Sequence, residues 1–380
     1  MSGIELAQIV VLFVFVVDSL LLVGLLVLKT THRLLGERHD RRRSDYVSLI
    51  SRHIVHRYCT DPITTEMSED PAFLDALIDV RNAVVGPELD TLHGIVDRYG
   101  VARSQESRLR SAFPLGRRLR AAVALAEMGD ESSAEVLMEH LSDPVREIRI
   151  QAARGLGRMR WTSAIDAIVT KLGTDTPWVA TRFADALVGF GSSATWPLLA
   201  YIRINHRFES RGPALAIRTL ASIGDEEAVI PLMDILEEAA DPEIALAAVE
   251  TLGALGSTLA LGRIREAASS PDWRIRAKAA TALGAIGDPS SSPVLARTLT
   301  DLNWWVRRNS AAALAQITGG IDHLYDALNG PDPYAADAAA EALADTGELV
   351  AAKRRLEDEG PTVRDLALLG YMGDRALVSR

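Results

Sequence analysis

A leucine recurs at nearly constant spacing through the last two-thirds of the chain. The successive steps are 31, 31, 33, 32, 31, 31, 29 and 26 residues. The recurring residues are Leu125, Leu156, Leu187, Leu220, Leu252, Leu283, Leu314, Leu343 and Leu369. A period between 20 and 50 residues is typical of a solenoid, in which each repeat buries its apolar face against its neighbours. This period constrains the fold more than any other feature of the sequence.

The residues around each leucine predict two helices per repeat. Apolar or small residues stand eight, four and one positions before the leucine and three after it, which is one stripe of a 3.6-residue helix. A glycine follows the leucine by four positions in most repeats, where its tolerance of the left-handed conformation ends a helix. These glycines are Gly129, Gly191, Gly224, Gly256, Gly287, Gly347 and Gly373. Arg160 and Thr318 interrupt the column, so we expect those two turns to differ.

Prolines and aspartates mark where the next repeat begins. Proline lacks the backbone N–H that the first turn of a helix leaves unpaired, so it is expected at the start of a helix. The prolines in this position are Pro144, Pro177, Pro242, Pro271, Pro333 and Pro361. Asp143, Asp241, Asp272 and Asp332 lie beside them, and each is expected to cap free N–H groups.

Together these residues resemble a known repeat. A D-P or P-D pair, then V/I-R, then A-A-x-A-L-G-x-x-G is similar to the HEAT-like repeats first described in the bilin lyases of phycobilisomes. The resemblance covers Arg117 to Arg380. It implies an all-α HEAT-like solenoid, an architecture that mostly binds other proteins. Because bilin lyases use the same repeat, the resemblance also leaves an enzymatic function open.

Composition narrows the function classes. The net charge is −10, which disfavours a nucleic-acid partner because phosphate contacts need a basic surface. One cysteine, Cys59, excludes an internal disulfide framework. The alanine- and arginine-rich composition is typical of a bacterial protein.

An apolar stretch near the N-terminus predicts a membrane anchor. Ile9 to Leu28 is long enough to cross a bilayer as a single-pass transmembrane helix and contains one charge, Asp18. An acid inside a membrane span is a functional candidate, so Asp18 is expected to dock the anchor to a partner; a tolerated neutral acid is the alternative. Positive residues follow the stretch and none precedes it. They are Lys29, Arg33, Arg38, Arg41, Arg42 and Arg43.

These flanking charges predict an orientation. Positive residues stay in the cytoplasm, so the N-terminus is expected outside the cell and the solenoid in the cytoplasm, at the cell membrane. The expected domains are a transmembrane anchor (1–28), a basic juxtamembrane segment (29–45), helices that could be degenerate capping repeats (46–116) and the HEAT-like solenoid (117–380). In residues 46–116, His53, His56 and Cys59 lack typical ligand spacing, so no metal site is predicted.

Two kinds of side chain recur in the solenoid at equivalent positions. Arg118, Arg149, Arg276 and Arg307 all stand seven residues before the leucine. Like residues at like positions favour an ion-pair or capping ladder between repeats over a catalytic row. Trp273, Trp304 and Trp305 lie where a repeat begins, with Trp178 in an equivalent place. They are either edge packing between repeats or exposed anchors for a partner.

No catalytic motif accompanies the repeats. The sequence has no GxxxxGK[ST] loop, no GxSxG elbow and no HExxH pair, so no cofactor, metal or catalytic residue is predicted. The sequence therefore predicts a membrane-anchored scaffold or adaptor that binds a protein partner and resembles accessory subunits of membrane enzymes such as glycosyltransferases. An enzyme of the bilin-lyase type that uses the solenoid groove is the alternative, and self-association stays open.

Overall fold

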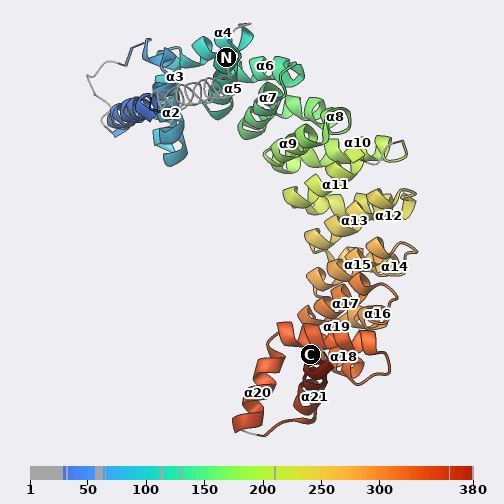
Figure 1. Ribbon diagram of the computed structural model, residues 1–380. Helices are drawn as coiled ribbons and strands as arrows, with labels where there is room; N and C mark the ends of the chain where they lie inside the picture. Colours follow the sequence, from blue (N-terminus) through green and yellow to red (C-terminus); the bar gives the residue numbers. More distant parts are fainter. Residues whose placement is uncertain are drawn as a thin grey trace, which may run out of the picture. The chain divides into compact units, whose positions relative to one another are not determined.

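The computed structural model is helical throughout the part of the chain that it describes (Figure 1). The described residues are 29–30, 33–55, 63–64, 66–111, 114–128, 131–208, 211–358 and 360–378; for 131, 132 and 374–378 only the backbone is described. They form two compact units, one ending at His140 and the other beginning at Leu141. Each unit has its own packing, and an all-α fold is therefore confirmed for the described residues.

The first unit contains helices of ten to fourteen residues and one longer helical segment. Residues 33–55 form the longer segment. The others are α2 (Pro71–Ala83), α3 (Pro87–Arg98), α4 (Val101–Arg110), α5 (Leu115–Met128) and the shorter α6 (Glu131–Glu139). Helix α4 contacts α5 and α6, and α2 contacts α5.

The longer segment lies against α2 through polar and aromatic contacts. The Tyr46 ring meets Phe73 edge-on, with 5.3 Å between ring centroids. Arg43 donates two hydrogen bonds to the carboxylate of Asp79, at 2.5 and 2.6 Å. The pairing raises the pKa of the Arg43 guanidinium, with the hydrogen bond to Asp79 as its main cause. These contacts attach the segment to the rest of the unit.

Arg33, Arg38, Arg41 and Arg42, which were also predicted to flank a membrane, lie on this segment, and Lys29 precedes it in the sequence. Arg42 pairs with Asp70 at 3.0 Å, and Arg33 pairs with Glu37 at 3.0 Å. Lys29, Arg38 and Arg41 are exposed. Arg33, Arg42 and Arg43 therefore have protein carboxylates as partners. The role of the six residues as a topology signal stays a prediction.

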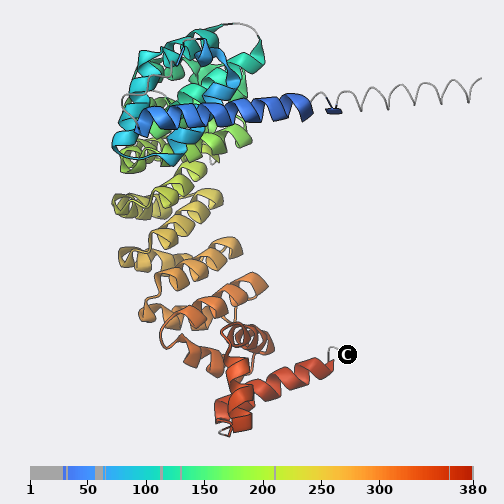
Figure 2. The ribbon, with the colours of Figure 1, turned by 90° about the vertical axis from the view of Figure 1, so that its left-hand side faces the viewer.

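The second unit is a stack of helix pairs in two layers (Figures 1 and 2). The first layer consists of α7 (Arg146–Met159), α9 (Pro177–Val188), α11 (Arg211–Ile223), α13 (Pro242–Leu255), α15 (Trp273–Ile286), α17 (Trp304–Gln316) and α19 (Pro333–Asp345). The second consists of α8 (Ile165–Thr174), α10 (Thr195–Asn205), α12 (Val229–Glu238), α14 (Leu261–Ala267), α16 (Ser292–Thr298) and α18 (Gly320–Leu328). Helices α20 (Glu348–Asp358) and α21 (Val363–Val378) follow. Consecutive members of the first layer contact one another, which is the predicted solenoid.

The leucine column forms the core of this stack. From Leu156 to Leu343 every recurring leucine is completely buried, and burying one leucine side chain contributes about 1.5–3 kcal/mol. The last position is an exception, because Leu368 is buried in α21 and Leu369 only partly. The final step is 26 residues, five short of the usual 31.

A glycine after the leucine lets neighbouring helices of the first layer approach closely. A Cβ on Gly253 would lie 2.5 Å from the Ala282 Cβ, and one on Gly284 would lie 2.7 Å from the Ala313 Cβ. The alanine precedes the leucine of the next repeat, so A-L-G is a contact motif between repeats. Glycine is needed on one helix and a residue as small as alanine on the facing helix, because the two backbones leave no space for added atoms.

The glycine turns form as predicted at five positions, and the predictions fail at two others, Arg160 and Gly373. Gly191, Gly224, Gly256, Gly287 and Gly347 have positive φ. Arg160 also has positive φ, at 52°, so the expectation of a different turn there is wrong. At Thr318 the turn does differ, because the left-handed residue is Gly319. The expected turn at Gly373 is wrong, because α21 runs through it to Val378. Gly129 lies outside the described residues.

Prolines begin half of the helices that they were expected to begin. Pro177, Pro242 and Pro333 are the first residues of α9, α13 and α19. Pro144, Pro271 and Pro361 instead lie two residues before α7, α15 and α21. At α15 this follows from Asp272, which accepts a hydrogen bond from the Arg274 amide and makes Trp273 the first helical residue.

The predicted arginine ladder is present between repeats. Arg276 donates from Nε and Nη2 to the Asp301 carboxylate at 2.7 and 2.9 Å. Its Nη1 donates to the carbonyl oxygens of Ser270 and Pro271. Arg149 repeats the arrangement with Asp175, at 3.1 and 2.9 Å. We call this arrangement the arginine clamp, because one side chain joins its own loop to the next.

The predicted membrane location needs correction. Within residues 29–378, gaps in the description aside, no helix is both long enough and apolar enough to cross a bilayer. This finding overturns the expected single-pass protein of the cell membrane with an outside N-terminus and a cytoplasmic solenoid. Residues 9–28 and Asp18, from which that location was predicted, lie outside the described residues.

Candidate functional site

Four aromatic side chains are exposed at the start of three successive helices. Trp273 begins α15, Trp304 and Trp305 begin α17, and Tyr334 is the second residue of α19. They are 40%, 45%, 50% and 64% exposed, in that order. Because the helices of one layer run in the same direction, their first residues lie along one edge of the stack. We call this set of four residues the aromatic edge.

Local capping fixes the position of each aromatic residue. Asp272, Asn303 and Asp332 are the N-caps of α15, α17 and α19. Each cap accepts a hydrogen bond from a backbone N–H in the first turn, which fixes where the helix begins. The next one or two residues therefore project at the edge, where there is no preceding turn to cover them. The sequence positions these rings through its caps.

The rings also contact one another and nearby cations. Trp304 and Trp305 meet edge-on with 4.6 Å between ring centroids. The Arg308 guanidinium lies 5.3 Å from the Trp304 ring, and the Arg307 guanidinium lies 5.1 Å from the Tyr334 ring. Such contacts hold the side chains in place, and little conformational entropy is lost because an aromatic side chain has few rotatable bonds. The aromatic edge is consequently preorganised.

Arg307 lacks the carboxylate that completes the arginine clamp elsewhere. It donates to the carbonyl oxygens of Asp301 and Leu302, as Arg276 does to its own loop. The position equivalent to Asp301 in the next repeat is Gly330. Arg307 is only 8% exposed and its Nε is buried without a hydrogen-bond partner. The Tyr334 ring thus takes the place of a counter-ion.

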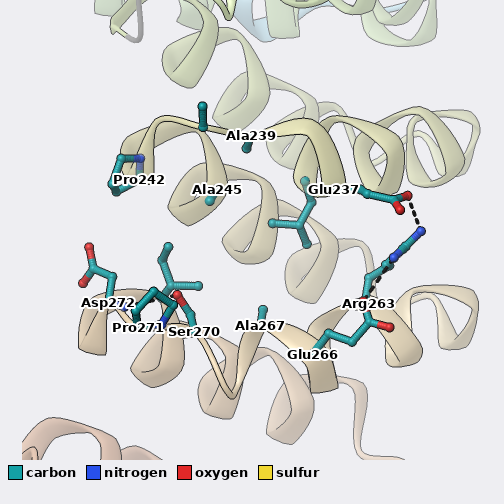
Figure 3. A pocket seen from close by; sticks show the side chains of 13 residues that line it. Glu237, Ala239, Pro242, Ala245, Arg263, Glu266, Ala267, Ser270, Pro271 and Asp272 are labelled. Atoms are coloured by element: carbon teal, nitrogen blue, oxygen red, sulfur yellow. Dashed lines mark hydrogen bonds and ion pairs between the residues drawn. The ribbon is translucent and has the colours of Figure 1, made fainter.

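A groove of about 420 Å³ lies beside the start of α15 (Figure 3). Its walls are the loop between α12 and α13 and the loop between α14 and α15, with Pro242 and Pro271 on opposite sides. Arg263 spans one end, pairing with Glu237 and with Glu266, the latter at 3.1 Å. Ala245 and Ala267 give the groove an apolar lining. Its size suits one or two inserted side chains.

The electrostatics of the groove favour binding over proton transfer. Arg274 donates from its side-chain Nε and Nη2 and from its backbone amide to the Asp272 carboxylate, and these hydrogen bonds lower the pKa of the Asp272 carboxyl below its ordinary value. Glu237 and Glu266 both pair with Arg263. General acid catalysis near neutral pH needs a carboxyl with a raised pKa, and Asp272 is shifted in the opposite direction. No cluster of three potential metal ligands occurs among the described residues.

The structure brings together the three tryptophans that were singled out in the sequence. Trp273, Trp304 and Trp305 are exposed on one edge, while Trp178 is exposed at the start of α9. Asp18, the fourth candidate for partner binding, lies outside the described residues. The packing of these tryptophans within an edge does not exclude a partner, because about half of each side chain remains accessible. Their role in binding stays a prediction.

Sequence reasoning missed two parts of this edge. Tyr334 stands where Trp305 and Trp178 stand in their repeats, so alignment to the leucine column would have found it. Leu302, completely exposed in the loop before α17, carries no periodic signal. The groove could not be read from the sequence, because its walls come from two repeats.

Comparison with known proteins now identifies the fold. A model described as HEAT repeats matches residues 107–188, 230–315 and 261–344, more than half of the chain. The chain belongs to the HEAT-repeat family. Phycocyanobilin lyase subunit beta of Pseudanabaena tenuis is 30% identical to this HEAT-repeat protein over 109 residues, which are 29% of this chain and 38% of that relative.

Solved structures are similar to this chain at low sequence identity. The Kap95:Nup1 complex matches with a TM-score of 0.54 and 14% identity, over 87% of this chain and 53% of that one. The complex of CpcE and CpcF of phycocyanin lyase from Nostoc matches with a TM-score of 0.33 and 19% identity, over 70% of this chain and 98% of that one. At these identities the likeness shows the HEAT-repeat fold alone.

Proposed function

We propose that this HEAT-repeat protein is a scaffold that binds a protein partner through the aromatic edge and the adjoining groove. The observation that carries the proposal is the set of four exposed aromatic rings at equivalent places in three consecutive repeats. Tryptophan, tyrosine and arginine are the residues that most often dominate binding energy in protein interfaces. All three types meet at this edge.

The geometry supports an anchor-and-pocket mode of binding. The rings offer large rigid contacts, and the groove next to Trp273 can receive an apolar side chain of the partner. Trp304 and Trp305 hold each other in place, so these two side chains lose little conformational entropy when a partner binds them. Kap95, which is similar in fold, was solved in a complex with Nup1, and this supports a protein partner for the present chain.

The alternative, a modifying enzyme that works in the groove, has no specific observation in its favour. The groove's acidic groups are engaged with Arg263 and Arg274. The expectation of an accessory subunit of a membrane enzyme rested on the predicted location and is not carried further.

The experiment replaces Leu302, which is fully exposed in the loop before α17, by a photo-crosslinking amino acid and identifies the captured protein by mass spectrometry. The affinity of the purified partner is then measured for wild type and for the double variant Trp304→Ala/Trp305→Ala. Two anchor residues of this kind are each expected to contribute at least ~2 kcal/mol, so the double variant should weaken binding by about 1,000-fold.

A matched control is available on the second layer. Trp196 is the second residue of α10, is 59% exposed and donates from Nε1 to Glu227 at 2.8 Å. Trp196→Ala should leave the affinity unchanged. Equal loss of affinity in both variants, or no loss in the double variant, would refute the proposed binding edge. Circular dichroism confirms that each variant is folded.

A further inference from the structure

The rings of the aromatic edge form two columns that run along the stack. Trp273 and Trp304 are each the first residue of their helix, and Trp305 and Tyr334 are each the second. Helices α15, α17 and α19 contact one another in succession (Figure 1), and helices in contact lie about 8–10 Å apart. Equivalent rings in neighbouring repeats are therefore offset by about this distance, which sets the spacing of the anchor points that a ligand has to match.

The charged side chains among the first five residues of α15 and α17 already have partners. Arg274 pairs with Asp272 at 2.7 Å and with Glu243 at 2.8 Å. Arg308 pairs with Glu341 at 3.9 Å. The remaining two arginines belong to the clamp column and donate to carbonyl oxygens of their own loops. A charged ligand would have to separate these pairs and a neutral ligand would not, so the edge favours a neutral ligand.

The ring N–H and O–H groups of the aromatic edge are donors that have no acceptor in the described part of the chain. Nε1 of each of its three tryptophans and the hydroxyl of Tyr334 donate to no described residue, whereas Nε1 of Trp196 donates to Glu227 at 2.8 Å. A tryptophan N–H or a tyrosine O–H normally has a partner once it is buried. A ligand that covers these rings must therefore bring hydrogen-bond acceptors.

A polyproline II helix has both the spacing and the free acceptors that this edge requires. It has three residues per turn and rises about 3.1 Å per residue, so residues on one of its faces recur about every 9 Å. Its carbonyl oxygens make no internal hydrogen bonds, and proline brings no N–H group. A β-strand returns to one face about every 7 Å, and an α-helix already uses its carbonyl oxygens in internal hydrogen bonds. Neither meets both requirements.

We propose that the aromatic edge binds a neutral, proline-rich segment of a partner protein in the polyproline II conformation. Prolines three residues apart lie against equivalent rings of neighbouring repeats, and carbonyl oxygens of the segment accept hydrogen bonds from the tryptophan Nε1 groups. Beyond Trp273 the segment continues into the groove between the loops that precede α13 and α15. The distance from α13 to α19 is three steps of about 9 Å, which about nine residues in this conformation span. The proposal rests on the proposed scaffold function and adds the chemistry of the segment that is bound.

The test measures, by fluorescence anisotropy with the full chain, the binding of a labelled twelve-residue peptide with the repeating unit Pro-Pro-Ala. The same peptide made of D-amino acids is the matched probe, because it has the same composition and apolarity but forms a helix of the opposite hand. The L-peptide should bind saturably, and the D-peptide should bind at least about tenfold more weakly. Because the ligand is neutral, the affinity should change by less than about twofold as salt is raised.

Single substitutions locate the contacts. Trp304→Ala and Trp305→Ala should each weaken binding of the L-peptide by about tenfold or more. Trp305→Phe keeps an aromatic ring but loses the Nε1 donor, so it should weaken binding by about two- to tenfold. Trp196→Ala removes a similarly exposed tryptophan of the second layer whose N–H is already bonded, and it should leave the affinity unchanged.

The outcomes separate this inference from the proposed function. Equal binding of the L- and D-peptides, or equal weakening by Trp196→Ala and Trp305→Ala, would overturn the inference. A helical peptide with leucines seven residues apart is the alternative probe. If it displaces the partner captured from position 302 and the L-peptide does not, the scaffold function stands and the polyproline II segment is wrong. If no partner is captured and the L-peptide does not bind, both proposals are wrong.

Discussion

Replacing Arg276 by methionine removes one complete arginine clamp from the middle of the stack. The Arg276 guanidinium makes two hydrogen bonds to the Asp301 carboxylate and two to the carbonyl oxygens of Ser270 and Pro271. The two ionised side chains are 18% and 12% exposed, so they are largely shielded from water. The variant leaves Asp301 without its counter-ion between α15 and α17.

The expected cost follows from the burial of this pair. Breaking a fully buried pair by removing one partner costs about 3–5 kcal/mol. Because both side chains retain some contact with water, we expect Arg276→Met to lower the free energy of unfolding by about 2–3 kcal/mol. Methionine retains an unbranched apolar stem, so little packing is lost.

Arg307→Met is the matched control, because Arg307 occupies the same column and has no aspartate opposite it. This variant loses two hydrogen bonds to carbonyl oxygens and a cation–π contact with Tyr334. It also removes a buried Nε that has no partner. These effects offset one another in part, so a loss of about 1 kcal/mol or less is expected.

Urea unfolding followed by circular dichroism measures both variants, and hydrogen exchange of the α15 and α17 amides locates the change. Repeat proteins can unfold segment by segment, so local exchange is the more direct measurement. The reasoning is wrong if the two variants lose the same stability to within about 0.5 kcal/mol, since the carboxylate would then contribute nothing.

Three further predictions concern the stack. The hydrogen bond from Arg276 lowers the pKa of the Asp301 carboxyl below its ordinary value of 3.8. The stability that this pair contributes to the folded protein is therefore complete above pH 3.8 and is lost as pH falls through the lower folded pKa. Asp301→Asn should make the unfolding free energy less dependent on pH in this acid range. Gly330→Asp supplies a carboxylate at the position where Arg307 lacks one, and it should raise the free energy of unfolding by about 1 kcal/mol, seen as a higher melting temperature. The new Cβ would lie 3.2 Å from a backbone oxygen, so a small local shift is needed. No change in melting temperature would mean that the Tyr334 ring already satisfies the Arg307 cation. Gly157→Ala should cost about 1–3 kcal/mol because the new Cβ would lie 2.4 Å from the backbone oxygen of Ala186, whereas Gly262→Ala, with open space around it in α14, should add about 0.5–1 kcal/mol in the same urea titration.

Much of the fold was open to prediction because the repeat reports its own environment many times. A leucine that recurs every 31 residues, with alanines four and one positions before it, can be buried only on one face of stacked helices. The left-handed turns at the recurring glycines could be predicted for the same reason, since the same residue recurs at the same place in several repeats. Arg160 shows the limit of such reasoning, because α7 ends on a left-handed residue there although the residue is arginine and not glycine.

The candidate site was only partly readable. Trp273, Trp304 and Trp305 could be aligned with one another, but exposure and burial have the same sequence signature for an aromatic residue at the start of a helix. The caps at Asp272 and Asn303 decide that these rings project at the edge. The groove beside them is formed by residues from two repeats.

The sequence by itself determined the helical repeat, its period, the buried leucines and the caps, because each depends on residues within one repeat. Only the tertiary structure decided how one repeat meets the next. It paired Arg276 with Asp301, left Arg307 against the Tyr334 ring and brought Gly157 against Ala186. Such contacts depend on the distance and register between neighbouring helices, and a single repeat does not encode either.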